Sequence, residues 1–386
     1  MIPTVVVTAK GAARWQAGHP WIYRSDVVTE RAPAGIVRVT DRKQRFLGQA
    51  LNSPASEIRL RLLAEDETPV DRAWWTRMIG RAAARREAIA RHATANRVVH
   101  AEGDGLPSLI VDRYGDYAVV QLLSAGIEAS RADVLAAVAE VLSPRGIILR
   151  NDASVRRRER LPLETIEVSG SVPDLVEVSE GDFRYRVPLR TGQKTGAFLD
   201  QRENRELMGT LALPGGRALD LFTYQGLFAI HLSRCAEHVT AVDSSGAALE
   251  LARDNAALNA RTNIEWVEAN VFDRLRAYER EGRRFDTIVL DPPAFAKHRG
   301  ALPRALAGYK EVNLRAMRLL AEGGVLFTAS CSFHVSRGAF FDMLGEAAVD
   351  SGRRLALERI VGQSSDHPEI VTIPETGYLK GAVLRA

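Results

Sequence analysis

The chain has 386 residues, of which 46% are hydrophobic and 26% are charged, with a formal net charge of +4 at pH 7. This composition predicts a globular protein of two or three domains and excludes disordered, collagen-like and disulfide-rich classes. No stretch reaches the roughly 18 apolar residues that a membrane span needs, and no secretory leader is expected. Cys235 and Cys331 provide no disulfide framework, so a cytoplasmic location is expected.

The positive charge is concentrated near the N-terminus. Residues 1–100 hold 17 Lys/Arg against 9 Asp/Glu, a net charge of +8, so the remaining 286 residues sum to −4. A basic module ahead of a mildly acidic remainder is typical of proteins that meet a polyanion. The alternative is compositional, because only six of the 52 basic residues are lysine and arginine is the common choice throughout.

Residues 1–66 predict short strands separated by Gly, Pro, Asn and Asp, which favours a small β-barrel. The predicted strands are 5–7, 36–40, 46–51 and 58–63. A helix capped by Asp71 is expected to run to about Thr94. Arg77, Arg81 and Arg85 line up along it, either to follow phosphates or as a solvated face.

Residues 67–187 are predicted to form this linker helix and a central α+β domain. The expected strands are 109–112, 117–122, 146–150, 176–178 and 183–187, and the expected helix is 129–142. Nothing in this region has the pattern of a catalytic site.

Residues 188–386 alternate apolar strands with helices, which predicts an α/β, doubly wound parallel sheet. The expected strands are 218–222, 238–242, 264–268, 287–290 and 324–329, and the expected helices are 227–234, 247–259 and 306–320. Segments 355–361 and 381–384 could add an antiparallel hairpin. In such sheets ligands bind beyond the carboxyl ends of the strands.

Two acids follow successive strands of this predicted sheet. Asp220 opens a turn that contains Tyr224 and Gly226, and Asp243, followed by Ser244, ends the next strand. A turn with one glycine suits a nucleoside without a pyrophosphate, and the second carboxylate is placed to accept both ribose hydroxyls. Each acid alone is more often a strand-end cap.

The third and fourth strands carry further candidates. Asn270 could bind an adenine amino group and the Val271 amide a ring nitrogen. Asp291, Pro292 and Pro293 form a rigid loop in which Phe295 could stack on a planar base.

The fifth strand leads into Ser330-Cys331-Ser332. A buried cysteine is usually a small hydrophobe. Cys331 is instead expected at the carboxyl end of a parallel strand, beside the Asp291 loop, whereas Cys235 is interpreted as structural.

These motifs resemble the class I S-adenosylmethionine-dependent 23S rRNA (cytosine-C5) methyltransferases. The resemblance spans essentially the whole chain and includes Gln193–Arg202, Gly362-Gln363 with Asp366-His367-Pro368, and Tyr378-Leu379-Lys380. Lys10-Gly11 and Gly18–Tyr23 are similar to the PUA RNA-binding module of these proteins. Asn270 stands where an Asp is frequent in the family.

The resemblance implies a PUA domain, a central α+β domain and a Rossmann-like methyltransferase domain. It implies S-adenosylmethionine as cofactor and ribosomal RNA as partner. The expected contacts of the cofactor are Lys194, Thr195, Phe198, Asp220, Tyr224, Gly226, Asp243, Ser244, Asn270, Val271 and Asp291. Pro292, Pro293 and Phe295 are expected at the substrate, no metal is expected, and a homodimer is an option.

Chemistry at cytosine C5 explains the residue types, because C5 becomes nucleophilic only after a thiolate adds at C6. Cys331 is the expected nucleophile, and Asp291 could hydrogen-bond a protonated N3. Two alternatives remain at this point. One is a base methyltransferase acting on an exocyclic amine or guanine N7, which needs no cysteine. The other is a non-catalytic RNA-binding protein built on a methyltransferase scaffold.

Overall fold

The computed structural model describes residues 2–296 and 298–386, which divide into two compact units. The first unit comprises Met1–Gly181, Val187–Leu199 and Asp366–Thr376, and the second comprises Asp182–Arg186, Asp200–Ser365 and Gly377–Ala386. Among the described residues, no helix has both the length and the apolar character needed to cross a bilayer. The predicted three-part division at residues 66 and 187 stays a prediction.

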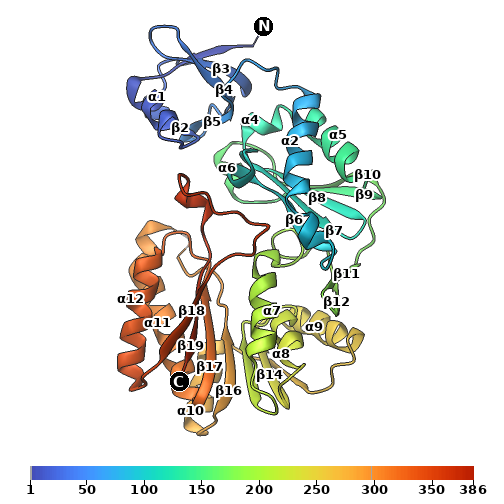
Figure 1. The fold of residues 1–386 in the computed structure, drawn as a ribbon, viewed down its shortest axis with the longest axis vertical. Helices are drawn as coiled ribbons and strands as arrows, with labels where there is room; N and C mark the ends of the chain where they lie inside the picture. Colours follow the sequence, from blue (N-terminus) through green and yellow to red (C-terminus); the bar gives the residue numbers. More distant parts are fainter. Residues whose placement is uncertain (1, 297) are drawn as a thin grey trace. The chain divides into compact units, whose positions relative to one another are not determined.

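The N-terminal part of the first unit is a five-stranded sheet with the order β1-β3-β4-β5-β2 (Figure 1). Val5, Val37 and Val39 are fully buried in its core. The chain after β2 returns to the open edge of β1, where the Val28 amide donates to the Val6 carbonyl, so the sheet closes on itself. The bounds are β1 (Thr4–Val6), β2 (Trp21–Tyr23), β3 (Gly35–Thr40), β4 (Phe46–Asn52) and β5 (Ile58–Ala64). Helix α1 (Ala9–Gln16), capped by Thr8, was not expected from the sequence.

The central part has a second five-stranded sheet with the order β10-β9-β8-β7-β6, covered by α2 and α5. Its core also takes in Leu51 and Leu63 of the first sheet. The bounds are α2 (Arg72–Ala84), α3 (Glu87–Ala90), β6 (Ala95–His100), β7 (Leu109–Tyr114), β8 (Tyr117–Leu122), α4 (Ala125–Glu128), α5 (Arg131–Leu142), β9 (Gly146–Asn151), α6 (Val155–Arg158), β10 (Glu164–Gly170) and β11 (Val176–Glu180). Strands β6 and β10 are additions to the predicted set.

The predicted continuous helix to Thr94 was wrong, because α2 ends at Ala84 and only the short α3 follows. The chain turns at Arg86, whose buried guanidinium donates to both carboxylate oxygens of Asp104 at 2.6 and 2.7 Å. Arg85 also pairs with Asp104 but stays exposed, so Arg77, Arg81 and Arg85 are all exposed members of the arginine row.

The second unit is built on a seven-stranded sheet with the order β15-β14-β13-β16-β17-β19-β18. Strand β19 runs antiparallel to both neighbours and the remaining pairs are parallel, which confirms the doubly wound prediction and its antiparallel hairpin. The strands of this sheet are β13 (Arg217–Leu221), β14 (His238–Asp243), β15 (Ile264–Glu268), β16 (Phe285–Leu290), β17 (Leu320–Ser330), β18 (Ala356–Val361) and β19 (Lys380–Arg385). Strand β12 (Phe183–Val187) is not part of it and lies where the chain passes between the two units.

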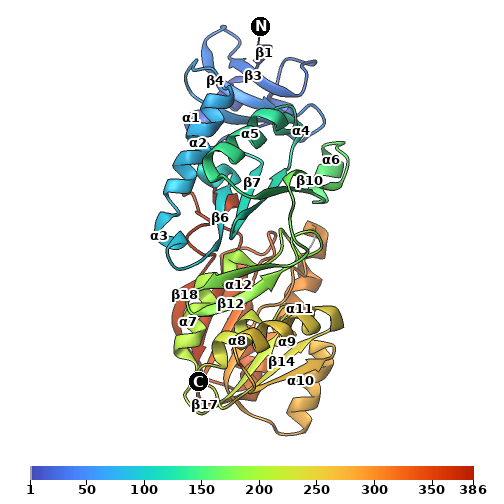
Figure 2. The same cartoon turned by 90° about the vertical axis from the view of Figure 1, so that its right-hand side faces the viewer.

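Helices cover both faces of this sheet (Figures 1 and 2). Leu219 and Leu221 of β13 face one core, with α10, α11 and α12, while Ala218 faces the other, with α7 and α8. The helices are α7 (Arg202–Leu211), α8 (Leu227–Leu232), α9 (Gly246–Leu258), α10 (Val271–Arg280), α11 (Leu302–Leu319) and α12 (Arg337–Ser351). Successive side chains of β13 therefore alternate between the two cores, as expected for a strand buried on both faces.

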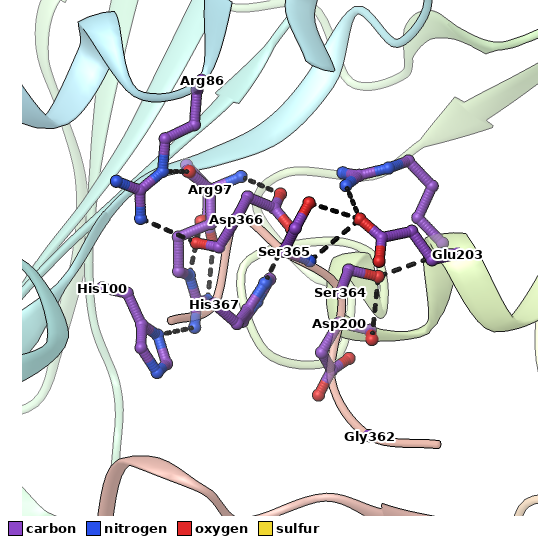
Figure 3. A network of polar contacts seen from close by, with 12 residues as sticks. Arg86, Arg97, His100, Asp200, Glu203, Gly362, Ser364, Ser365, Asp366 and His367 are labelled. Carbon is purple, nitrogen blue, oxygen red and sulfur yellow. Dashed lines mark hydrogen bonds and ion pairs between the residues drawn. The ribbon is translucent and has the colours of Figure 1, made fainter. Parts of the chain in front are cut away.

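The chain leaves the second unit after Ser365 and contributes Asp366–Thr376 to the first. Asp366 is fully buried there, and its Oδ2 accepts from the Arg97 amide at 2.8 Å while its carbonyl accepts from Arg86 at 2.8 Å (Figure 3). Just before this point, the Ser364 hydroxyl donates to the Asp200 carbonyl within the second unit. The predicted Asp366-His367 motif thus has a structural role.

Candidate active site

The strand order of the second unit reverses at β13, which lies between β14 and β16. The carboxyl ends of these three strands therefore lie side by side, and each carries one of the predicted acids at or directly after its end: Asp220, Asp243 and Asp291. This is the point in an open α/β sheet where ligands bind. The sequence-based placement of these acids at one sheet edge is confirmed.

The turn after β13 has an unusual backbone. Phe222, Tyr224 and Gly226 have φ values of 64°, 50° and 76°, a left-handed conformation that costs energy for the two aromatic residues. A Cβ at Gly226 would lie 2.6 Å from the Trp266 ring, so only glycine fits there. The structure holds this turn in one strained shape, as a preformed binding turn requires.

Asp220 is buried at the base of this turn. Its Oδ2 accepts from the Ala229 amide at 2.9 Å and from the Thr223 hydroxyl at 2.5 Å. Its buried Oδ1 receives no hydrogen bond from the described residues. Burial, together with the nearby carboxylates of Asp291 and Asp243, raises the pKa of Asp220 to about 7. A carboxyl of this kind would be stabilised in its charged form by a bound cation.

Asp243 fixes the turn from the next strand. Its Oδ2 accepts from the Tyr224 amide and its Oδ1 from the Ser245 amide, both at 2.9 Å. The carboxylate is partly exposed and Ser244 is exposed. Asp243 therefore joins the first two strand ends and still presents acceptor capacity to a ligand, since each carboxylate oxygen has two lone pairs.

Asn270 has a structural role that was not expected from the sequence. It is the N-cap of α10, and its side-chain oxygen accepts from the Phe272 amide at 2.9 Å. This oxygen satisfies amides that the first helical turn leaves without partners. The predicted adenine contacts of Asn270 and of the buried Val271 stay predictions.

The Asp291 loop is tied to the loop after β17. The Tyr309 hydroxyl lies 2.8 Å from the Ser332 hydroxyl and 3.4 Å from the Pro293 carbonyl, and the Ala296 amide donates to Ser332 at 3.2 Å. These contacts join the Asp291 loop to the loop that carries Cys331. The predicted proximity of Cys331 to the Asp291 loop is confirmed.

Phe295 is partly buried in a cluster of aromatic rings. Its ring centroid lies 4.6 Å from that of Tyr309, 6.0 Å from Phe272 and 6.4 Å from Phe222. A stacking surface for a base stays a prediction for this residue. Phe333, two residues after Cys331, is 59% exposed.

Lys194, Thr195 and Phe198 belong to the first unit, and the Lys194 ammonium lies 4.6 Å from the centre of the Phe198 ring. The Thr195 hydroxyl is buried and donates to Asp112 at 2.6 Å, with the Tyr114 hydroxyl at 3.0 Å. These contacts give Thr195 a structural role. The cofactor contacts expected of the three residues stay predictions.

Two family models match this chain. Residues 5–65 match a PUA-like domain, and residues 150–384 match an S-adenosylmethionine-dependent methyltransferase. The first match covers the closed sheet of the first unit, and the second covers the seven-stranded sheet.

Curated relatives match over nearly the full length. "Ribosomal RNA large subunit methyltransferase I" of Shewanella amazonensis is 39% identical over 377 residues, which is 95% of each chain. The protein of the same name from Escherichia coli strain SMS-3-5 is 37% identical over 378 residues, again 95% of each chain.

Solved structures share the fold. A putative methyltransferase from Streptococcus mutans, described as S-adenosylmethionine-dependent, has a TM-score of 0.85 at 20% identity and full coverage of both chains. A putative methyltransferase solved in complex with SAH has a TM-score of 0.87 at 20% identity, again with full coverage.

Proposed function

Because this chain belongs to the family of S-adenosylmethionine-dependent methyltransferases that carry an N-terminal PUA-like domain, we propose that it methylates C5 of a cytidine in 23S ribosomal RNA. Its relatives are named as methyltransferases of large-subunit ribosomal RNA. The observation that carries the choice of C5 is Cys331, a thiol on a loop joined by Tyr309 and Ser332 to the Asp291 loop. The cytoplasm is the proposed location.

The strand ends suit this cofactor. The buried Oδ1 of Asp220 and the nearby carboxylates of Asp243 and Asp291 favour a ligand with positive charge, and S-adenosylmethionine carries a sulfonium and an ammonium. When bound, the cofactor supplies an electrophilic methyl group. Asp243, with Ser244 beside it, would hold the ribose hydroxyls, while Tyr224 and Gly226 would shape the turn around the cofactor.

The protein side chains would prepare the base. The Cys331 thiolate adds to C6, and the electron pair moves toward N3 and O2 of the ring, which makes C5 nucleophilic. N3 takes up a proton as this pair arrives, and the Asp291 carboxylate accepts a hydrogen bond from the resulting N3–H and so favours the protonated ring. After methylation, loss of the C5 proton reforms the C5–C6 double bond and expels the thiolate.

Delivery of the base requires an unpaired or flipped cytidine, since a stacked base cannot reach Cys331. Exposed cations of the first unit would bind the surrounding phosphates. Arg42 and Lys43 lie at the exposed tip of the β3–β4 hairpin, while Arg77 and Arg81 line an open groove of about 470 Å³. We propose Pro292, Pro293 and Phe295 as substrate contacts beside the base.

Methylation at C5 can be tested by the fate of the hydrogen that it replaces. RNA transcribed with [5-³H]cytidine is expected to release tritium into water in a one-to-one ratio with methyl groups transferred, because only C5 chemistry displaces that hydrogen. Transfer to an exocyclic amine or to guanine N7 would methylate the RNA without tritium release. The absence of both methylation and tritium release would support the non-catalytic RNA-binding alternative.

Cofactor binding is expected to release a proton from Asp220. At pH 6 this carboxyl, with its pKa near 7, is mostly protonated, and a bound cation favours the charged form. Affinity for S-adenosylmethionine should therefore fall as the pH drops below about 7. In the cofactor-free protein, the same raised pKa makes the free energy of unfolding decrease as the pH rises from about 4 to 7, because the folded state binds the proton of Asp220 more tightly than the unfolded state does.

Calorimetry at pH 6 in two buffers with different ionisation enthalpies measures this proton. We expect release approaching one proton in the wild type and loss of that release in Asp220→Asn. S-adenosylhomocysteine, which has no sulfonium charge, is the ligand control and should release less. If S-adenosylmethionine bound the wild type with the same apparent enthalpy in both buffers, no proton would be released, and this would contradict the assignment of Asp220 to the cofactor site.

A further inference from the structure

Lys380 is a buried charged residue for which the steps above give no role. It is 5% exposed and begins β19, where its backbone is paired with Ser330, the residue before Cys331. Burying an ammonium group is costly unless a charge or hydrogen-bond acceptors compensate it. Its position calls for a physical explanation.

The ammonium lies close to the Cys331 loop. Its Nζ donates to the Ser332 carbonyl at 2.7 Å and to the Tyr378 carbonyl at 2.8 Å. The backbone of Lys380 is therefore paired with the residue before Cys331, and its side chain is bonded to the residue after it. An ammonium has three donors, and these two carbonyls use two of them.

We propose that Lys380 is a positioning residue whose ammonium group keeps the Cys331 sulfur ionised. A cation beside a thiol favours the thiolate, the form that attacks carbon. The same charge would stabilise the thiolate again when it leaves C6. Attack on cytidine rests on the proposed function, whereas the ionisation of Cys331 can be measured without RNA or cofactor.

The electrostatics of the groups around Cys331 agree with this arrangement. Burial lowers the pKa of Lys380 to about 8, and its electrostatic interaction with Cys331 opposes that shift. Arg337, at the start of α12, adds positive charge near Lys380. Tyr309, from α11, has a pKa raised mainly by burial and also by Cys331, so it stays neutral near pH 7. Lys380 and Arg337 are thus the cations among these named groups.

The rate at which Cys331 is alkylated by iodoacetamide, followed by mass spectrometry across pH in a Cys235→Ser background, tests the proposal. The midpoint is the pH at which the alkylation rate of Cys331 reaches half of its maximum. In the protein with Lys380 intact, we expect this midpoint below the ordinary thiol pKa of about 8.5. Lys380→Met should raise it by about one pH unit or more, so that alkylation near pH 6.5 slows about tenfold. Lys380→Arg, which keeps the charge, should restore most of the low midpoint.

Lys310→Met is the matched control, because this lysine pairs with Glu346 and Asp350 on α12 and has no described contact with Cys331. It should leave the midpoint unchanged. An unshifted midpoint in folded Lys380→Met would overturn the proposal. If that variant does not fold, a midpoint at or above about 8.5 with Lys380 intact would overturn it equally. Failure of tritium release with a low midpoint would instead reject the proposed function alone.

Discussion

Cys331→Ala is expected to abolish methyl transfer while S-adenosylmethionine still binds. The thiol lies on the loop after β17, whereas the acids proposed for the cofactor lie at the carboxyl ends of β13, β14 and β16. Loss of a covalent nucleophile costs several orders of magnitude in rate, on the order of 10³ or more. Trimming one partly buried sulfur has a far smaller effect on packing. Methyl transfer and calorimetric cofactor affinity, measured on the same preparation, separate the two effects.

RNA carrying 5-fluorocytosine gives a second readout of the same residue. The wild type should form an adduct that resists denaturation, because fluorine cannot leave C5 as a proton and the thiolate stays attached to C6. Cys331→Ala should form none. Cys235→Ala is the matched control, since Cys235 lies outside the proposed site with its thiol 3.6 Å from the Gly209 carbonyl. Near-normal turnover of Cys331→Ala, or an adduct at Cys235, would reject the C5 mechanism.

Asp291→Asn is expected to lower kcat by about 10²–10⁴, the usual contribution of a positioned acid–base group. The amide keeps the shape of the side chain but cannot supply the negative charge that the protonated N3 needs. Adduct formation with 5-fluorocytosine should slow in parallel, since N3 protonation assists the addition to C6. Stopped-flow or quench measurements of both rates test this.

Asp286→Asn is the control: it changes a carboxylate on β16, the strand that Asp291 directly follows. Asp286 lies near the opposite end of β16, where it accepts from the Arg217 amide at 2.7 Å. Its replacement should leave kcat within a few-fold of wild type. If Asp291→Asn weakened cofactor binding with kcat unchanged, Asp291 would belong to the cofactor site alone.

The second unit was predictable because buried parallel strands are nearly continuous apolar runs. The strands that contain Leu219–Leu221 and Val239–Val242 could be identified in this way, and the acids at their carboxyl ends, Asp220 and Asp243, were placed correctly. Helix α10 was missed because its sequence is mostly polar and its cap, Asn270, was interpreted as a ligand residue. An asparagine after a strand can serve as a helix N-cap or as a binding side chain, and the local sequence does not distinguish the two roles.

Contacts across distant parts of the chain could not be predicted. Tyr309 and Lys380 approach Cys331 only because α11 packs on the sheet and β19 pairs with β17. Neither residue follows a strand end, which was the rule used to select candidates. Arg86 lies in the segment that was predicted as one continuous helix, but its ion pair with Asp104 holds it in the core.

The passage of Asp366–Thr376 through the first unit has a consequence for biosynthesis. A ribosome makes Arg86 and Arg97 long before Asp366, yet both hydrogen-bond to that residue in the finished protein. The Arg97 amide therefore gains this carboxylate only when nearly the whole chain has been translated. The N-terminal unit can form most of its core early, but its last buried polar groups are satisfied only at the end of synthesis. Truncated products that end before Asp366 should consequently be recognisable to proteases as incompletely folded.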